Sequence, residues 1–185
     1  MIQHKEQRVG IFIDIQNLYH SAKNLHGARV NYGELMKHLV GDRKLVRALG
    51  YVVKSDPETG EDSFFDALNK VGIELRIKDI QVFSSGAKKA DWDVGMAVDA
   101  IRMAPLLDVI ILVTGDGDFV PLVDYLKWGL GRGVEVAAFG RTCSQRLRES
   151  TERFIDLESD HKLVFRSPRR TTSNPARRNL PRRNA

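Results

Sequence analysis

The sequence is poor in cysteine and has no long apolar run. Its 185 residues include a single cysteine, Cys143, which excludes an intramolecular disulfide and a zinc site built from several thiolates. The first eight residues, Met1 to Arg8, lack the apolar stretch of a signal peptide, and no run approaches the length of a membrane span. We therefore expect a cytoplasmic protein with no membrane partner.

Acidic residues are absent from the C-terminal end. From Arg166 onward the chain has seven arginines, three prolines and no Asp or Glu, so this tail carries +7 and residues 1–165 carry −2 of the net +5. A segment with so little apolar surface cannot offset the entropy cost of ordering its backbone. We expect residues 1–165 to form one domain and residues 166–185 to form a disordered, basic, arginine-rich tail.

Arginine-rich arms of this kind bind nucleic-acid phosphates. The alternative for the tail is a solvated segment that only improves solubility. The tail residues expected to contact RNA are Arg169, Arg170, Arg177, Arg178, Arg182 and Arg183.

Two continuous apolar runs each end in acidic residues. Val9–Ile13 precedes Asp14, and Val109–Val113 precedes a turn with Asp116 and Asp118. Continuous β-branched runs are typical of central strands in a parallel sheet that helices cover on both faces. Ligands bind at the carboxyl ends of such strands, so these carboxylates are expected to converge there. Crowded carboxylates repel one another, and an oxygen-rich site suits Mg²⁺ or Mn²⁺.

Strands and helices alternate along the chain. Besides the two acid-tipped strands, the patterns predict strands at 45–53, 73–80 and 134–139, the second of them near a sheet edge. Helices are expected at 18–26, 31–40, around 64–71, at 91–103 and 119–128, and one opening at 142–145. This order predicts a doubly wound, three-layer α/β domain with a mainly parallel sheet.

Each acid also has a purely structural explanation. Asp14 and Asp118 occupy positions typical of helix N-caps, and Asp93 falls in a first helical turn, where the helix dipole favours an acid. Asp116 has no such explanation, because it lies between Gly115 and Gly117, whose missing side chains leave room for a ligand near the backbone.

A third group, Lys88-Lys89-Ala90-Asp91-Trp92-Asp93, opens the helix that continues to Asp99. Asp99 follows Asp93 by six residues, which places it about 120° around the helix, so both cannot face one metal. We expect Asp93 to be the ligand and Asp99 to orient a water or a lysine. Lys88 and Lys89 are either solvated or contact the substrate backbone.

Three segments together resemble the signatures of NYN domains, in the PIN-like nuclease superfamily, and in particular its bacterial LabA-like branch. They are Phe12 to Asn17, Lys89 to Asp99 and Thr114 to Phe119, in the order typical of that family. Family members often carry Lys-Gly-Val-Asp before the helix. Here the stretch is one residue longer, which leaves Asp91 and Asp93 both open as the ligand.

The resemblance implies a PIN-like fold and a metal-dependent ribonuclease with Mg²⁺ or Mn²⁺ as cofactor. It assigns Asp14, Asp93, Asp116 and Asp118 to the acidic site, and Asn17, Asp99 and Thr114 to supporting positions. The expected partner is single-stranded or structured RNA, and a homodimer is the expected form if the chain self-associates.

Three other functions fit parts of the sequence. A non-catalytic RNA-binding or regulatory module would gain nothing from buried carboxylates. A haloacid-dehalogenase-like phosphatase would need an acid where Gln16 stands, because an amide cannot act as the general acid. Cys143 near a helix start would have a lowered pKa as a nucleophile, but no histidine can be assigned as its partner.

Overall fold

The computed structural model describes residues 3–54, 62–79, 81–82, 88–89 and 91–166. The predicted tail lies outside these residues from position 167 on, and so do its six arginines that were expected to contact RNA. Arg166 ends the last strand.

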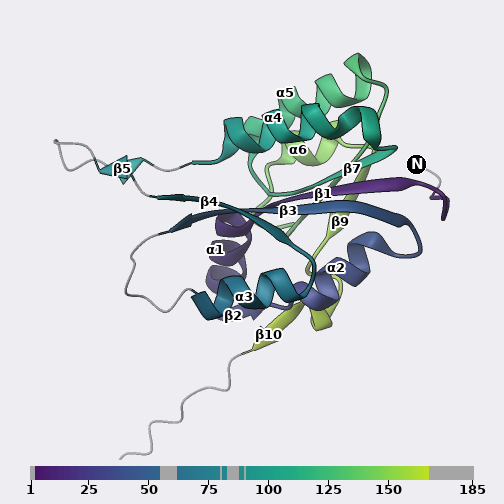
Figure 1. The fold of residues 1–185 in the computed structure, drawn as a ribbon. Coiled ribbons are helices and arrows are strands. Elements are labelled where there is room, and N and C mark those ends of the chain that lie inside the picture. Colours follow the sequence, from purple (N-terminus) through teal and green to yellow (C-terminus); the bar gives the residue numbers. More distant parts are fainter. Residues whose placement is uncertain (1–2, 55–61, 80, 83–87, 90, 167–185) are drawn as a thin grey trace, which may run out of the picture.

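A six-stranded sheet forms the centre of the molecule (Figure 1). Its strands, in spatial order, are β4 (Glu74–Asp79), β3 (Lys44–Lys54), β1 (Arg8–Asp14), β7 (Val109–Val113), β8 (Gly133–Ala138) and β9 (Arg153–Asp156). All five neighbouring pairs are parallel, which confirms the predicted fold class. Along the chain, β1, β3 and β4 extend the sheet in one direction, and β7, β8 and β9 extend it in the other. The strand order therefore reverses between β1 and β7. In such sheets this reversal point is where ligands bind.

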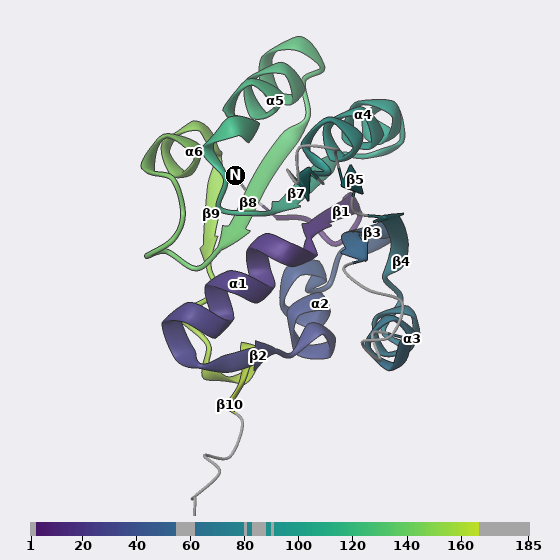
Figure 2. The same cartoon turned by 90° about the vertical axis from the view of Figure 1, so that its left-hand side faces the viewer.

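Helices cover both faces of the sheet, as Figures 1 and 2 show from two directions. One face carries α1 (Ile15–His26), α2 (Tyr32–Val40) and α3 (Asp62–Lys70), and the other carries α4 (Asp93–Met103), α5 (Val120–Asp124) and α6 (Gln145–Ser150). Along β1, Ile11 and Ile13 pack in the first core while Phe12 packs in the second. Because both faces are buried, the strand needs apolar residues at every position.

Several small elements complete the fold. β2 (Ala28–Val30) pairs antiparallel with β10 (Val164–Arg166), and β5 (Gln81–Val82) pairs antiparallel with β6 (Lys88–Lys89). The short turns are η1 (Ala104–Leu106), η2 (Gly117–Phe119), η3 (Tyr125–Gly129) and η4 (His161–Leu163). The sequence patterns did not predict β2, β9 or β10, because runs of three or four residues show too few periods to recognise.

Some predicted helix bounds were wrong. α1 starts at Ile15 rather than residue 18, since Asp14 caps it directly after the strand. The helix expected at 119–128 divides into η2, α5 and the π-helical turn η3. At α6 the predicted cap is missing, because the Ser144 side chain makes no capping hydrogen bond. The Asn31 cap of α2 is confirmed: its Oδ1 accepts from the Glu34 backbone N–H at 3.2 Å.

A buried ion pair joins the segment between α2 and β3 to β8, away from the acid-tipped edge. Glu135 on β8 is completely buried, and its carboxylate accepts from Arg43 Nη1 at 2.9 Å and Nη2 at 3.1 Å. Arg43 also donates to the Leu39 carbonyl at 2.6 Å. Arg153 adds a longer contact of 3.3 Å from a side chain that is 39% exposed. The pair therefore holds opposite charges inside the fold with their hydrogen bonds satisfied.

Among the helices in the described part of the chain, none is both long and apolar enough to cross a bilayer.

Candidate metal centre

Three carboxylates converge at the edge where the strand order reverses. Asp93, Asp116 and Asp118 each offer an oxygen within 4.8 Å of the others. Asp93 opens α4, whereas Asp116 and Asp118 belong to the turn after β7. Asp93 and Asp116 are half-buried and Asp118 is exposed. The chain therefore presents three acidic oxygens, drawn from two distant segments, on one accessible spot.

The turn after β7 fixes the Asp116 carboxylate. Its Oδ1 accepts from the Asp118 backbone N–H at 3.0 Å and caps η2. The Asp116 N–H in turn donates to Thr114 Oγ1 at 3.2 Å, and Thr114 is completely buried. The capping role therefore belongs to Asp116, not to Asp118 as the sequence suggested. A carboxylate can fill this role while its charge still faces the neighbouring acids.

The two glycines of this turn make room for another loop of the protein. A Cβ on Gly115 would lie 3.1 Å from the Thr142 carbonyl oxygen and 3.2 Å from Cys143 Cα. A Cβ on Gly117 would lie 2.7 Å from Ser144 Oγ. The sequence predicted that these glycines leave space for a ligand. That prediction was wrong, because residues 142–144 fill the space.

Asp14 lies beside the triad but, in the described residues, outside the 4.8 Å group. Its carboxylate caps α1 by accepting from the Asn17 backbone N–H at 3.0 Å, and it also hydrogen-bonds the Thr114 side chain. Asn17 Oδ1 accepts from the Gly115 N–H at 3.1 Å. Asn17 and Thr114 thus join the carboxyl ends of β1 and β7, which keeps Asp14 close to Asp116.

Trp92 sets the position of Asp93. Its indole Nε1 donates to the Val52 carbonyl of β3 at 2.8 Å, and a Cβ on Gly95 would lie only 2.6 Å from the ring. The close packing of Trp92 on Gly95 fixes the first turn of α4. As a result Asp93 faces the acids, while Asp91 is exposed and belongs to no such group among the described residues.

Asp99 faces away from the triad. It accepts from the Tyr51 hydroxyl at 3.1 Å and from Arg76 Nε at 3.3 Å. Tyr51 and Arg76 are register partners on β3 and β4, so Asp99 ties α4 to the outer strands. This placement follows from the rotation of about 120° between Asp93 and Asp99.

Asp99→Asn should therefore keep the wild-type affinity for Mn²⁺, because its carboxylate is bound to Tyr51 and Arg76. Isothermal titration calorimetry with Mn²⁺ measures this, and Asp93→Asn, expected to bind much more weakly, is the matched control. A loss of about 10- to 100-fold in the Asp99 variant would instead place it among the groups that orient the metal ligands.

Two of the acids, Asp93 and Asp14, have raised pKa values. Burial raises the pKa of Asp93, and the charges of Asp116, Asp14, Asp91 and Asp118 add to the effect. Burial also raises the pKa of Asp14 despite its hydrogen bond from Asn17, and Asp116 contributes in the same direction. Groups held this close are stabilised by a cation, and a divalent ion with hard oxygen preference fits this set of donors.

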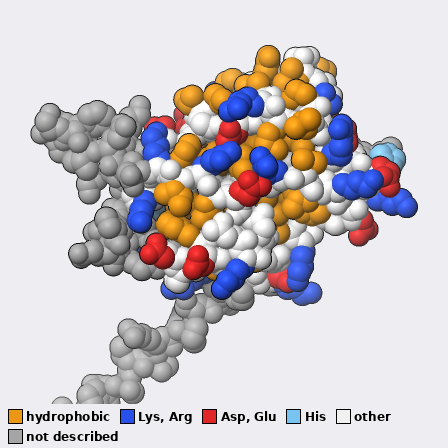
Figure 3. Space-filling view, in the orientation of Figure 1, with side chains coloured by type: hydrophobic (Ala, Val, Ile, Leu, Met, Phe, Trp, Pro, Cys, Tyr) orange, Lys and Arg blue, Asp and Glu red, His pale blue; other side chains and the backbone are white. Residues whose placement is uncertain are grey.

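An apolar groove of about 340 Å³ opens beside the triad, between α4 and α5. Asp93 and Asp118 line it together with Ala97, Phe119 and Tyr125. Figure 3 shows hydrophobic side chains gathered over these helices in the upper part of the view. The triad is thus reachable along a surface that is largely uncharged.

Two further predicted groups are the lysine pair before α4 and the single cysteine. Lys88 and Lys89 form β6, five and four residues before Asp93, but their side chains lie outside what the structure describes. Burial raises the pKa of the Cys143 thiol, whereas the nucleophile hypothesis required it to be lowered. Cys143 is therefore not an activated thiolate.

The NYN domain family matches residues 8–158. The chain belongs to the NYN domain family. The family lies in the PIN-like nuclease superfamily, so membership indicates a nuclease or related hydrolase, and the three-acid cluster of this NYN domain can hold a divalent metal.

Two relatives cover nearly the whole NYN domain. The low amplitude and bright protein LabA of Synechococcus elongatus is 26% identical over 173 residues, which span 89% of this chain and 91% of that protein. A crystal structure of a protein of unknown function from Vibrio parahaemolyticus superposes with a TM-score of 0.80 at 28% identity, over 89% of this chain and all of the other. The Vibrio protein therefore shares the fold of this chain over most of its length.

Proposed function

We propose that this NYN domain is a ribonuclease that cleaves RNA phosphodiester bonds with Mg²⁺ or Mn²⁺. The convergence of Asp93, Asp116 and Asp118 within 4.8 Å carries the proposal. An acid with a raised pKa in an accessible cluster of carboxylates, as Asp93 is here, is typical of a functional site. Membership of a family related to nucleases adds support.

The chain's own residues supply a fixed, negatively charged cradle. Asp93, Asp116 and Asp118 would hold the metal, and Asp14 would add charge next to them. A bound divalent ion supplies a water of lowered pKa and stabilises the charge that develops on the transferring phosphoryl group. The hydrogen bonds from Asp118 N–H to Asp116 and from Asn17 N–H to Asp14 hold both carboxylates in place before substrate binds.

The experiment that tests the proposal is RNA cleavage with EDTA and after addition of Mn²⁺. We expect cleavage only with the metal and products with 5′-phosphates. Binding of RNA without cleavage under any metal condition would instead indicate a regulatory RNA-binding module. Turnover of a phosphomonoester without RNA cleavage would indicate a phosphatase.

Truncation after Arg166 should weaken binding of every RNA sequence and flatten its salt dependence. The truncation keeps β10 and removes six arginines. Each phosphate contact on a single strand contributes about −0.7 to the slope of log affinity against log salt. Fluorescence anisotropy over a salt series measures the slope.

The matched control for the truncation is the full chain with these six arginines replaced by glutamine. It should give the same flattened slope, and turnover at saturating RNA should survive in both variants. If the truncated and wild-type slopes were identical, the tail would be a solubility segment.

A further inference from the structure

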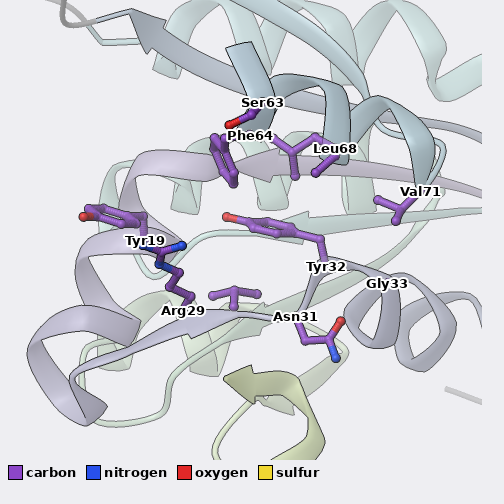
Figure 4. A pocket seen from close by; sticks show the side chains of 11 residues that line it. Tyr19, Arg29, Asn31, Tyr32, Gly33, Ser63, Phe64, Leu68 and Val71 are labelled. Atoms are coloured by element: carbon purple, nitrogen blue, oxygen red, sulfur yellow. The ribbon is translucent and has the colours of Figure 1, made fainter. Parts of the chain in front are cut away.

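A second pocket, of about 610 Å³, lies on the opposite face of the sheet from the α4–α5 groove. It is formed by α1, β2, the start of α2, and α3, and Figure 4 shows its lining. Tyr19, Tyr32 and Phe64 contribute aromatic rings, Leu68 closes the apolar floor, and Arg29 supplies a positive charge. Its volume falls in the range of small-molecule sites, about 300–1,000 Å³.

Two of the three aromatic rings are accessible, whereas Tyr32 is partly buried and packs against the core. Tyr19 is 41% exposed and Phe64 is 37% exposed. Phe64 meets Tyr32 edge-on, at an angle of 61° with 5.9 Å between ring centroids, and Figure 4 shows the two rings next to each other in the pocket. Aromatic surface that is open to solvent contributes no burial free energy to the fold. A flat apolar ligand that covers the rings would bury this surface, which would favour its binding.

Positive charge lies next to these rings. Lys23 Nζ stands 5.5 Å from the Tyr19 ring centroid, and Arg29 is exposed on β2 at the pocket wall. Aromatic platforms beside basic side chains are the combination that binds single-stranded nucleic acid, where bases stack and the backbone meets the cations.

The pocket adjoins the acid-tipped edge through α1. Asp14 caps that helix, and Tyr19 follows five residues later, about 7.5 Å along the axis. Burial raises the pKa of the Tyr32 hydroxyl, and the charge of Asp14 raises it further, so Asp14 and Tyr32 are neighbours electrostatically. A strand bound at the acids therefore has this pocket within reach on the α1 side.

We infer that this pocket binds a nucleobase of single-stranded RNA, stacked on Tyr19 and Phe64, while Arg29 contacts a neighbouring phosphate. The inference rests on the proposed function, since it places the base beside the bond to be cleaved. Because every base has a π face, the pocket accepts any of the four bases.

The test is RNA binding by the full chain in EDTA, monitored by the anisotropy of a short fluorescein-labelled single-stranded RNA. Tyr19→Leu and Phe64→Leu keep an apolar side chain but remove the ring. Each should weaken binding about 5- to 150-fold, the range that corresponds to the loss of one stacked base. Tyr19→Phe keeps the ring and should bind like the wild type.

Two controls separate stacking from other effects. Trp128→Leu removes an aromatic that is 81% exposed outside the pocket and should leave the affinity unchanged. An abasic ribose-phosphate oligomer has nothing to stack, so wild type and Tyr19→Leu should bind it equally.

The outcomes distinguish this inference from the proposed function. If wild type binds and cleaves RNA while Tyr19→Leu and Phe64→Leu bind it as tightly, the nucleobase pocket is wrong and the nuclease stands. If wild type and Tyr19→Leu bind the abasic oligomer with different affinities, the pocket recognises something other than a base. If wild type neither binds RNA in EDTA nor cleaves it with Mn²⁺, both proposals are wrong.

Discussion

Asp116→Asn and Asp93→Asn should each lower the rate of RNA cleavage at least about 100-fold. Each removes one negative charge from the triad while keeping the size of the side chain. A metal contributes several kcal/mol to the transition state, and each 1.4 kcal/mol corresponds to about tenfold in rate. Single-turnover cleavage at fixed Mn²⁺ measures the loss.

The fold should survive these changes. Asparagine is as good an N-cap as aspartate, so in Asp116→Asn the amide oxygen can still accept from the Asp118 N–H. Without metal the melting temperature should hold or rise, because repulsion between carboxylates is relieved. Asp91→Asn is the matched control, since Asp91 is exposed one residue before Trp92, and it should cleave normally. An inactive Asp91 variant beside an active Asp93 variant would reverse the assignment.

Glu135→Gln should lower the free energy of unfolding by about 3–5 kcal/mol, because it leaves the buried Arg43 without its counter-charge. Both side chains are almost wholly inaccessible, at 0% and 4% exposure. Urea unfolding followed by circular dichroism measures the change. Cleavage by the fraction that remains folded should be normal, since the pair is remote from the acids.

Arg153→Gln is the control for that experiment. It removes the partly exposed partner of the same carboxylate and should cost at most about 1 kcal/mol. Replacing both members of the buried pair, as Arg43→Met with Glu135→Leu, should recover much of the loss. If Glu135→Gln and Arg153→Gln lowered the free energy of unfolding equally, burial of the ion pair would not explain the effect.

The sequence was sufficient for five of the six strands of the sheet, all but β9, and for the region of the site. The unbroken apolar runs before Asp14 and Asp116 require strands covered on both faces, and parallel strands bring those acids to one edge. β1 and β7 are indeed neighbours, with Val9 paired to Val109. The expected edge strand at 73–80 is β4, at one end of the sheet.

The finer contacts depended on information that the sequence does not carry. Asp99 binds Tyr51 and Arg76 because β3 and β4 lie side by side beneath α4, and strand order cannot be read from periodicity. Likewise, a glycine pattern does not say whether a ligand or a loop fills the space, and at Gly115 it is the loop. The role of Trp92 could not be predicted from the sequence either, because it depends on a hydrogen bond to the Val52 carbonyl of β3.

The pairing of β1 with β7 also sets when the site can form during synthesis. Val9 finds Val109 only after about a hundred further residues have been made, which takes about 5–20 s at about 5–20 residues per second. Until then Asp14 has no Asp116 beside it, and Asp116 and Asp118 of the triad have yet to be made. On the proposed function, a growing chain is therefore harmless to the RNA from which it is being translated, and cleavage can begin only once the second half of the domain has folded onto the first.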